Sequence, residues 1–353
     1  MVAEQLRRRP PGGIGTYLRG LVQGLRALGP AAPELSLWAS RPPSRGADPA
    51  AALGRVTTSP LPGRALVAAW DRGFLTYKGP ADLVHAPSLA VPPRGGAPLT
   101  VMVHDVAWRR VPEAFPRRGR HWHEAALGRA RARAALLLAP SRSTADDLVA
   151  AGVPAASVEV VEEGSDHLPA ADLSAAADVL ARLQVGGPYL LTVSTLEPRK
   201  NLERLVAAYE RARPRLPEPC PLVVVGPRGW GDQRLPEADG VAWAGWLDDA
   251  TLCGLYARSL AVAYVPLLEG FGLPALEAMA AGTAVVASPM PSTGGAALEV
   301  DPLDVRAIAE ALGRVACDHD TRQNLVEAGL ARARSLTWAA AAARHVEIWR
   351  ALA

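Results

Sequence analysis

Two glutamates, Glu269 and Glu277, are the residues in this sequence with the clearest potential for chemistry. The stretch between them begins with Gly270, Phe271, Gly272 and Leu273. It follows an apolar run and opens a helical pattern, and glycines at the start of a helix let backbone N–H groups approach a ligand. Glu277 is the one charged residue between positions 270 and 287, which a solvated surface charge would not explain. We therefore expect both carboxylates to border one ligand-binding cleft.

A second candidate is the cationic pair Arg199 and Lys200, within a run, EPRKN, that links an apolar stretch to a helical pattern. Cations at the start of a helix oppose its macrodipole, so they need a nearby anion. A diphosphate would supply that anion. Lys200 is one of only two lysines in the chain, the other being Lys78, so a codon bias towards arginine does not explain it. A pair of solvated cations is the less favoured alternative.

Two further candidates lie in the first half of the chain. His104 follows an apolar run directly, where the carboxyl end of a strand opens into a ligand site. It can donate to a sugar hydroxyl or stabilise developing charge, or it can be a loop histidine bonded to the backbone, with Asp105 as a turn or cap residue. Gly13 belongs to the glycine-rich turn 11–15, which precedes a helix expected over about 16–28 and suits a phosphate. A turn that only needs positive φ is the alternative, and for the turn alone it is the favoured one.

The segment Arg117–Arg133 carries six arginines against a single acid, Glu124, and it contains Trp122. A basic helix with an interfacial aromatic residue can bind anionic lipid. A solvated arginine-rich face is the favoured alternative, because arginine is frequent throughout the chain. Nucleic acid is a third option, but no stacking platform or recognition motif accompanies the charge. We expect no nucleic-acid partner and keep peripheral contact with an anionic membrane as a hypothesis.

Alternating strands and helices must position these residues. Apolar runs typical of buried strands occupy residues 99–103, 135–139, 189–193, 222–225, 260–265 and 284–287. Helical patterns between them occupy 201–213, 249–258 and 276–281. This alternation predicts an α/β fold with parallel sheets covered on both faces. At 353 residues the chain favours two domains, 1–167 and 168–335, with a last helix at 336–353 that either closes the second domain or crosses back to the first.

Composition excludes several classes of protein. The chain is 49% apolar and 21% charged, so it is not disordered. Its three widely spaced cysteines form no CxxC pair, which argues against a disulfide framework or a zinc site and favours a reducing compartment. No signal peptide or transmembrane run is visible, so we expect a cytoplasmic location. Residues 1–167 hold 21 basic and 14 acidic groups, against 17 and 21 in 168–353, which indicates that the first half meets an anion.

The start of the chain is irregular. A glycine-rich turn such as 11–15 normally follows a buried first strand, but only Met1–Ala3 could contribute one here. Arg7, Arg8 and Arg9 cannot be buried unless they are paired. We therefore expect that the first strand is truncated and that longer versions of the chain are more soluble and active.

Taken together, these blocks resemble the family-4 (glycosyl transferases group 1) retaining glycosyltransferases of GT-B fold. Glu269 and Glu277 match the family's signature of two glutamates separated by seven residues, within EGFGLPALEAMAAGTAVVAS. TLEPRKNL at 195–202 resembles its donor-phosphate motif, and GGIGTY, VHDV and APSRSTADDL resemble blocks of its amino-terminal domain. The resemblance spans nearly the whole chain. It implies two Rossmann-like domains with parallel sheets that face each other across a cleft.

For the phosphate end of a nucleotide-sugar, the resemblance implies three contacts. Lys200, helped by Arg199, would neutralise the diphosphate. Gly13 would approach the same diphosphate from the other domain. No metal or other cofactor is implied, because arginine and lysine can replace a metal ion in this task.

For the remainder of the donor, the resemblance implies contacts to the sugar and the ribose. Glu269 and the backbone amides of Gly270–Leu273 would hold the donor sugar. Glu277 would bind the ribose hydroxyls. His104 would contact the donor sugar near the reacting centre.

The resemblance implies a retaining hexosyltransferase that acts in polysaccharide biosynthesis. It would move a hexose, with mannose as the candidate, from a nucleotide-sugar to a glycan or polyprenyl-linked acceptor. The mechanism would be metal-independent and front-face, with the leaving phosphate taking the acceptor proton. Two alternatives stay open: a non-catalytic nucleotide-sugar-binding protein or inactive glycosyltransferase partner, and a GT-B sugar-nucleotide epimerase or phosphorylase. Ser194 and Thr195 stand where many relatives carry an arginine, which keeps the non-catalytic alternative open.

Overall fold

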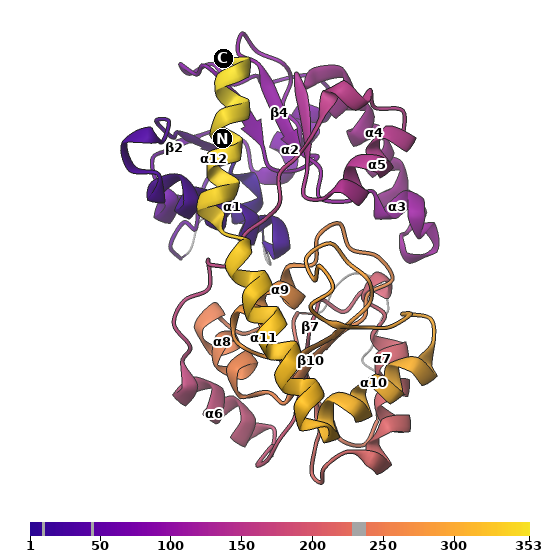
Figure 1. The fold of residues 1–353 in the computed structure, drawn as a ribbon. Helices are drawn as coiled ribbons and strands as arrows, with labels where there is room; N and C mark the ends of the chain where they lie inside the picture. The colour runs from indigo at the N-terminus through magenta and orange to yellow at the C-terminus, as the bar shows by residue number, and fades with distance from the viewer. Residues whose placement is uncertain (9–10, 44–45, 228–237) are drawn as a thin grey trace. The chain divides into compact units, whose positions relative to one another are not determined.

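The computed structural model describes residues 1–353 apart from 9–10, 44–45 and 228–237 (Figure 1). Contacts within the chain divide it into two compact units. Unit 1 comprises Met1–His167 and Leu336–Ala353, and unit 2 comprises Leu168–Ser335. Each unit has its own parallel sheet and hydrophobic core, and each is described by itself.

Unit 1 contains a parallel sheet in the order β3-β4-β5-β6 and a parallel pair, β1-β2. The strands are β1 (Leu37–Ala39), β2 (Val56–Thr58), β3 (Val84–Ala86), β4 (Leu99–Met102), β5 (Leu136–Ala139) and β6 (Val158–Val160). The helices are α1 (Gly12–Ala27), α2 (Gly63–Asp71), α3 (Ala107–Arg110), α4 (Arg117–Arg133), α5 (Arg142–Ala150) and α12 (Trp338–Leu352). β4 and β5 consist almost entirely of buried apolar residues, as strands covered on both faces require.

The first residues of the chain join the two strand groups of unit 1. Val2 forms a parallel bridge with Trp38 of β1, and its N–H donates to the carbonyl oxygen of His85 in β3 at 2.8 Å. Met1–Ala3 therefore lies between β1 and β3 as a short extended segment.

The arginines that follow this segment differ from one another. The Arg7 side chain is only 4% exposed, and its guanidinium bonds both carboxylate oxygens of Asp48, so it is buried in a paired form. Arg8 is exposed. Arg9 lies outside the described residues.

Unit 2 contains a parallel sheet in the order β12-β11-β10-β7-β8-β9. The strands are β7 (Leu190–Val193), β8 (Leu222–Val225), β9 (Val241–Gly245), β10 (Ala261–Tyr264), β11 (Val285–Ala287) and β12 (Leu298–Glu299). The helices are α6 (Leu173–Arg182), α7 (Leu202–Ala212), α8 (Asp249–Arg258), α9 (Leu273–Ala280), α10 (Val305–Cys317) and α11 (His319–Ser335). The side chains of Asp172, Asp248 and Asp304 accept backbone N–H groups at the starts of α6, α8 and α10, which fixes where these helices begin.

The strand order of unit 2 has a switch point between β7 and β10. From β7 the chain builds outward through β8 and β9, and it then returns to the other side of β7 for β10, β11 and β12. In open α/β sheets, ligands bind outside the carboxyl ends of the strands at such a point. The segments that follow β7 and β10 are therefore where a ligand site is expected.

The predicted α/β fold with parallel sheets is confirmed, and each run predicted as a strand contains one. Two predicted helix starts are wrong. The glycine-rich turn 11–15 does not precede a helix, because α1 already begins at Gly12, whose φ is +63°. α9 begins at Leu273 and not at 276, because the left-handed Gly272 ends the preceding loop and Pro274 fits the first helical turn.

The final helix, α12, packs against α1 in unit 1 (Figure 1). Trp338 at its start is fully buried. A Cβ on Gly20 would lie 2.0 Å from the indole ring of Trp338, and one on Gly24 would lie 2.0 Å from its carbonyl oxygen. Glycine at these two positions is therefore what allows α1 and α12 to approach so closely.

Tyr17 of α1 lies in a buried network of histidines. Its hydroxyl is 2.8 Å from Nε2 of His345 in α12 and 3.0 Å from Nε2 of His85 in β3. Nδ1 of His345 is 2.8 Å from the carbonyl oxygen of Ala341, which can only accept, so Nε2 of His345 accepts from Tyr17. His85 then donates from Nε2 to Tyr17 and accepts at Nδ1 from Thr100. Burial lowers the pKa of His345 to about 4 and that of His85 well below its usual range, so both rings are neutral.

We predict that this network makes unit 1 sensitive to acid. A histidine whose pKa is lower in the folded than in the unfolded chain binds protons more readily when unfolded. Its contribution to stability is therefore complete above its ordinary pKa of 6.5 and is lost as pH falls towards 4. Urea unfolding at neutral pH and at about pH 5 measures how much the free energy of unfolding falls with pH. We expect a smaller fall in His345→Gln. A free energy of unfolding with the same pH dependence in both proteins would contradict the prediction.

Candidate functional site

The switch point of the unit 2 sheet brings the cationic pair and one signature glutamate together. Arg199 and Lys200 lie in a short 3-10 turn after β7, and Glu269 follows β10. Because β7 and β10 are parallel neighbours, the two segments leave the sheet at the same edge. The cations precede α7, which begins at Leu202, and so they do not lie in its first turn.

Asn201 fixes the turn that carries Lys200. Its φ of +60° is left-handed, a conformation that asparagine adopts more readily than most residues. Its side-chain amide donates to the carbonyl oxygens of Val265 at 2.9 Å and Pro302 at 2.7 Å. Since Val265 directly follows β10, these bonds hold the cationic turn against the segment that leads to Glu269.

Lys200, Glu269 and Tyr264 form one hydrogen-bonded group, which we call the Lys200 cluster. Nζ of Lys200 donates to Oε1 of Glu269 at 2.6 Å and to the hydroxyl of Tyr264 at 2.7 Å. That hydroxyl donates to Oε1 of Glu269 at 3.0 Å, and a guanidinium nitrogen of Arg199 lies 3.5 Å from the same oxygen. The side chains of Lys200 and Glu269 are each 12% exposed. From the sequence we expected a diphosphate to balance the charge of Arg199 and Lys200, whereas in the structure Glu269 balances it.

The electrostatics of the Lys200 cluster keep Glu269 charged. Burial alone would raise the pKa of this carboxyl, but Lys200 and Arg199 outweigh burial and hold the pKa below its usual value. Burial, followed by the charge of Glu269, raises the pKa of Tyr264 well above its usual range, so its hydroxyl stays protonated. At neutral pH the cluster therefore consists of a cation, an anion and a neutral donor.

Glu277, the second signature glutamate, is held by another tyrosine. It lies in α9, it is buried, and its Oε2 accepts from the hydroxyl of Tyr256 in α8 at 3.1 Å. Burial, followed by the charge of Glu277, raises the pKa of Tyr256 well above its usual range, and Tyr264 adds to the effect. Each signature glutamate thus accepts a tyrosine hydroxyl. Sequence reasoning missed both tyrosines, because each lies in a pattern typical of apolar core residues.

In the loop between the two glutamates, backbone groups and not side chains are available to contact a ligand. Phe271 and Leu273 are buried. Gly272 has a φ of +105°, and a Cβ there would lie 2.4 Å from Sδ of Met290. Its place in the loop therefore requires glycine. Contacts from Gly270–Leu273 to a ligand would have to come from backbone groups, as the sequence led us to expect.

His104 of unit 1 follows β4, as predicted, and both of its ring nitrogens contact protein acceptors. Nδ1 lies 3.0 Å from Oε1 of Glu163, and Nε2 lies 2.9 Å from the carbonyl oxygen of Pro87. The ring meets that of Tyr17 edge-on, with centroids 5.0 Å apart. Oδ1 of Asp105 accepts the backbone N–H of Ala107 two residues further on, whereas the N-cap of α3 is Val106, so this aspartate has the turn role given as an alternative and not the capping role. Sequence reasoning missed Glu163.

Gly13 lies in the first turn of α1, next to glycines with structural reasons to be there. Gly12 needs its positive φ, and a Cβ on Gly15 would lie 2.5 Å from Cβ of Pro11. Gly13 has no positive φ, and among the described residues no atom lies within 4 Å of where its Cβ would be. Packing therefore does not account for glycine at position 13, and the approach of a ligand stays the expectation.

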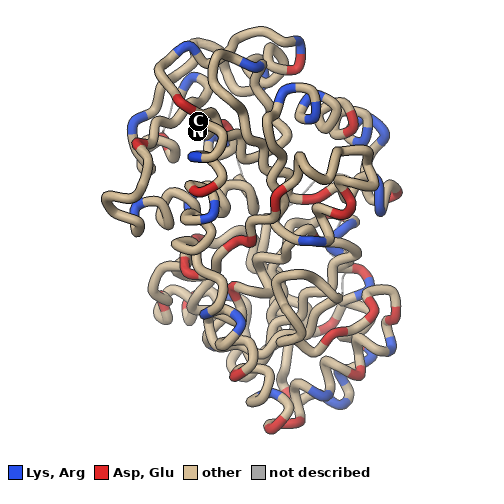
Figure 2. The backbone as a smooth tube through the Cα atoms, turned by 45° about the horizontal axis from the view of Figure 1, so that its top comes forward, with Lys and Arg blue, Asp and Glu red and all other residues tan. Residues whose placement is uncertain are grey.

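Helix α4 does not present the interfacial aromatic residue that the lipid hypothesis used. Trp122 packs against the core of unit 1, and its Nε1 donates to Asp71 at 3.0 Å. Arg129 pairs with the same aspartate at 2.7 Å, and Arg133 donates to two backbone carbonyls. Acidic and basic positions are interspersed over both units (Figure 2). In the part of the chain that the structure describes, no helix is long and apolar enough to cross a bilayer.

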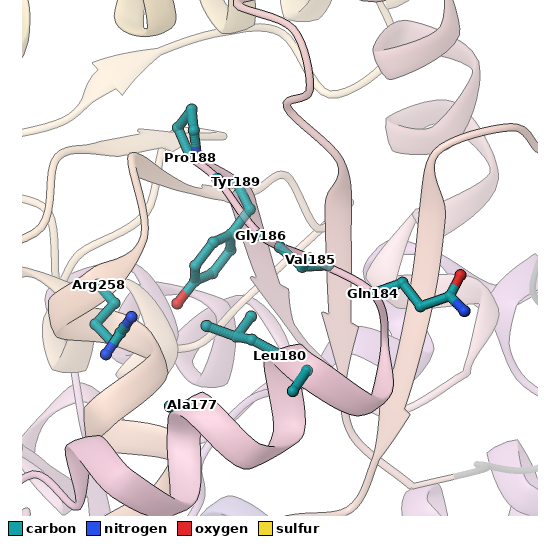
Figure 3. Close-up of a pocket in the computed structure, with 10 residues that line it drawn as sticks. Ala177, Leu180, Gln184, Val185, Gly186, Pro188, Tyr189 and Arg258 are labelled. Atoms are coloured by element: carbon teal, nitrogen blue, oxygen red, sulfur yellow. The ribbon is translucent and has the colours of Figure 1, made fainter.

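The candidate site contains no metal-binding cluster among the described residues, and one cavity of unit 2 lies away from it. Within the described ranges, no group of His, Cys, Asp and Glu side chains could hold a metal ion. A cavity of about 690 Å³ lies beside Pro188, Tyr189 and Arg258 (Figure 3). Pro188 and Tyr189 precede β7, so this cavity is at the amino end of the strand whose carboxyl end leads to Lys200.

Comparison with known proteins places the chain in a family. Residues 187–318 match the family Glycosyl transferases group 1, and residues 11–167 match Glycosyltransferase Family 4. The O-antigen chain mannosyltransferase B of Escherichia coli is 30% identical over 271 residues, which cover 72% of this chain and 71% of that protein. The chain belongs to the family-4 glycosyltransferases. It is therefore an enzyme of the hexosyltransferase class.

A further sequence relative and several solved structures are similar to this glycosyltransferase. The phosphatidyl-myo-inositol mannosyltransferase of Mycobacterium tuberculosis is 34% identical over 173 residues, which cover 44% of this chain and 45% of that protein. The crystal structure of Anabaena Alr3699/HepE in complex with UDP and glucose gives a TM-score of 0.73 at 18% identity and covers 99% of this chain and 98% of that one. WaaG, a glycosyltransferase involved in lipopolysaccharide biosynthesis, gives a TM-score of 0.64 at 15% identity, with 96% of each chain covered. These structures show that the glycosyltransferase has the GT-B fold.

Proposed function

We propose that this glycosyltransferase is a retaining hexosyltransferase whose nucleotide-sugar donor binds to unit 2. The observation that carries the proposal is the position of the Lys200 cluster at the switch point of the sheet, with Arg199 beside it. A buried cation at this edge suits a diphosphate, and a carboxylate beside it suits sugar hydroxyls. Structural neighbours solved with UDP or with UDP-glucose support a nucleotide-sugar as the donor.

Donor binding would exchange one anion for another at Lys200. The diphosphate would bind Lys200 and Arg199, and Glu269 would then accept hydrogen bonds from the hydroxyls of the donor sugar. The main chain of Gly270–Leu273 would lie along the same sugar, at the amino end of α9. Glu277 would accept from the ribose hydroxyls.

Transfer breaks the bond between the anomeric carbon and the phosphate oxygen. Positive charge develops on the sugar and negative charge on the leaving diphosphate, so fixed cations such as Lys200 and Arg199 lower the barrier. The acceptor hydroxyl would attack from the face that the phosphate leaves, and a phosphate oxygen would take its proton, which retains the configuration. This route uses no protein nucleophile and no metal ion. His104 would contact the donor sugar, and Gly13 would approach the diphosphate.

The donor sugar that we propose is mannose, and the acceptor is a glycan or a polyprenyl-linked glycan in polysaccharide biosynthesis. The proposal rests on relatives at 30% and 34% identity, which are an O-antigen chain mannosyltransferase and a phosphatidyl-myo-inositol mannosyltransferase. Glucose carried by UDP is the competing donor, because it is the one bound in a structural neighbour. The reaction class is the same in both cases.

A panel of donors tests the proposal. Thermal shift with GDP-mannose, UDP-glucose and dTDP-glucose identifies what binds, and release of nucleoside diphosphate in the presence of mannosylated acceptors measures transfer. We expect GDP-mannose to raise the melting temperature, and Glu277→Ala to remove most of that rise because the ribose contact is lost. The absence of a shift with every donor would contradict the proposal. Binding without release of nucleotide would favour the non-catalytic alternative.

We predict that Tyr264→Phe weakens donor binding while the strand stays intact. The change removes the hydroxyl that donates a hydrogen bond to Glu269 and accepts one from Lys200, and it keeps the aromatic ring. Hydrogen bonds to charged groups are worth about 1.5–3 kcal/mol, so affinity for the donor should fall about 10-fold or more. Titration calorimetry measures the change. Tyr189→Phe is the matched control, because its hydroxyl bonds the carbonyl of Leu255 at the other end of the sheet, and an equal loss in both variants would contradict the prediction.

We further propose that the exposed arginines at the start of α4, Arg117 and Arg118, contact an anionic membrane. Each cation near such a surface contributes about 1 kcal/mol, and salt screens the attraction. We predict that the protein co-sediments with phosphatidylglycerol vesicles at low ionic strength and that replacing both arginines by glutamine reduces the bound fraction several-fold. Arg306→Gln, an exposed arginine of unit 2, should leave it unchanged. Failure to co-sediment at low ionic strength would remove the proposal.

A further inference from the structure

The contacts of His104 determine where its protons are. The carbonyl oxygen of Pro87 has no hydrogen to give, so Nε2, at 2.9 Å, must donate to it. The carboxylate of Glu163 accepts in the same way, so Nδ1, at 3.0 Å, must donate as well. A ring that donates from both nitrogens is an imidazolium. The side chain of Glu163 is 3% exposed, which makes it a buried and directed partner and not a passing surface charge.

We propose that Glu163 is a positioning residue that keeps both ring nitrogens of His104 protonated, so that His104 meets the substrate only as a hydrogen-bond donor. The proposal rests on the proposed function for the part that concerns the substrate. The protonation of His104 itself does not depend on it. Glu163 acts through His104 and does not itself touch the donor sugar.

Glu163 is the main source of this charge. Burial alone would lower the pKa of His104, but the hydrogen bond and the charge of Glu163 outweigh burial and raise the pKa above its usual value, and the carbonyl of Pro87 and the charge of Asp105 add to the effect. The other titratable groups that face it are Tyr17 of α1 and His85 of β3, and both are neutral. His345 of α12 lies behind Tyr17 and is neutral as well. The histidines of this region thus differ in charge because Glu163 bonds His104.

The consequence for the reaction follows from the two contacts. Nδ1 stays with Glu163, while Nε2 can exchange the carbonyl of Pro87 for a hydroxyl or phosphate oxygen of the donor. A hydrogen bond from a charged ring is roughly twice as strong as one between neutral groups. An imidazolium cannot accept a proton, so His104 cannot act as a general base while both of its ring nitrogens donate. This agrees with a mechanism in which the leaving phosphate takes the acceptor proton.

A nuclear magnetic resonance titration of the histidine rings tests the proposal in the whole chain without any donor. The His104 signal is identified by its loss in His104→Gln. We expect it to titrate above 6.5 in the unsubstituted protein and below 6.5 in Glu163→Gln, which keeps an acceptor for Nδ1 but removes the charge. The control, Glu162→Gln, changes the exposed neighbouring carboxylate and should leave the signal where it was. Titration of His104 at or below 6.5 in the unsubstituted protein overturns the proposal, even if Glu163→Gln does not fold.

The pH dependence of sugar transfer distinguishes the proposed role of Glu163 from a purely structural one, which would not change it. In Glu163→Gln we expect the rate to fall about 10- to 100-fold relative to the unsubstituted protein above neutral pH and to recover as the pH is lowered and His104 is protonated. A rate reduced equally at every pH would overturn the proposal. If no donor is turned over at all, the proposed function fails, whereas the ring titration still decides the protonation of His104.

Discussion

Lys200→Ala is expected to lower the affinity for the nucleotide-sugar about 10- to 100-fold. The substitution removes the ammonium that would bind the diphosphate, and a lost charged hydrogen bond costs about 1.5–3 kcal/mol. Arg199 remains 3.5 Å from Glu269 and would keep part of the attraction for the diphosphate, so we expect binding to be weakened and not abolished. Titration calorimetry with the donor identified in the panel measures the affinity.

The same substitution has a second, independent signature. Without Lys200, Glu269 keeps its burial but loses its main partner, so its pKa rises and the free energy of unfolding at neutral pH falls. Lys78→Ala is the matched control, because Lys78 is the other lysine of the chain and lies exposed in unit 1. It should change neither quantity. Donor affinity that is unchanged in Lys200→Ala would contradict the assignment of this edge of the sheet as the donor site.

Trp338→Ala is expected to lower the free energy of unfolding of unit 1 by about 3–5 kcal/mol, the usual cost of removing a fully buried aromatic side chain. The indole lies on Gly20 and its Nε1 donates to Nδ1 of His167 at 3.0 Å. Gly20 and Gly24 of α1 carry no side chain that could fill the space, and the nearby Tyr17 ring, whose centroid lies 5.9 Å from that of Trp338, is held by its hydrogen bonds to His85 and His345. The substitution therefore leaves a cavity at the contact between α1 and α12.

Hydrogen exchange of peptides from α1 and α12 measures this effect within unit 1, since two units need not unfold in one step. Trp246→Ala is the matched control, because Trp246 is 66% exposed in unit 2 and its removal should change stability by no more than about 0.5 kcal/mol. Similar exchange from α1 in both variants would show that Trp338 does not hold the two helices together.

The strands and the principal charged residues of unit 2 could be predicted from the sequence for local reasons. Buried parallel strands need short, near-continuous apolar runs, and such runs are visible without knowledge of any partner. Lys200 and Arg199 stood out because cations before a helix need an anion. Glu277 stood out because it interrupts an apolar stretch, and Glu269 stood out because it begins the glycine-containing loop eight residues earlier. Each of these signals depends on residues that are neighbours in the chain.

The partners of these residues could not be predicted in the same way. Tyr264 lies in an apolar strand, and nothing in its local pattern distinguishes a tyrosine that bonds Glu269 from one that only fills the core. Glu163 lies 59 residues from His104, and only the packing of β4 beside its neighbours brings them to 3.0 Å. For Trp122 the sequence predicted a residue at an interface, because it lies on a basic helix, whereas in the structure it is half-buried against the core of unit 1 and bonds Asp71.

By itself the sequence determined the α/β class, the parallel strands and which charged side chains are available, because these follow from hydrophobic periodicity and from residue types at short spacing. Only the tertiary structure decided which charges are paired. The contact between Lys200 and Glu269 spans 69 residues, and it forms because β7 and β10 are adjacent in the sheet. Strand order depends on how the helices pack against the whole sheet, and no local sequence pattern predicts it. The charge state and orientation of His104 and Glu269 are therefore properties of the folded chain.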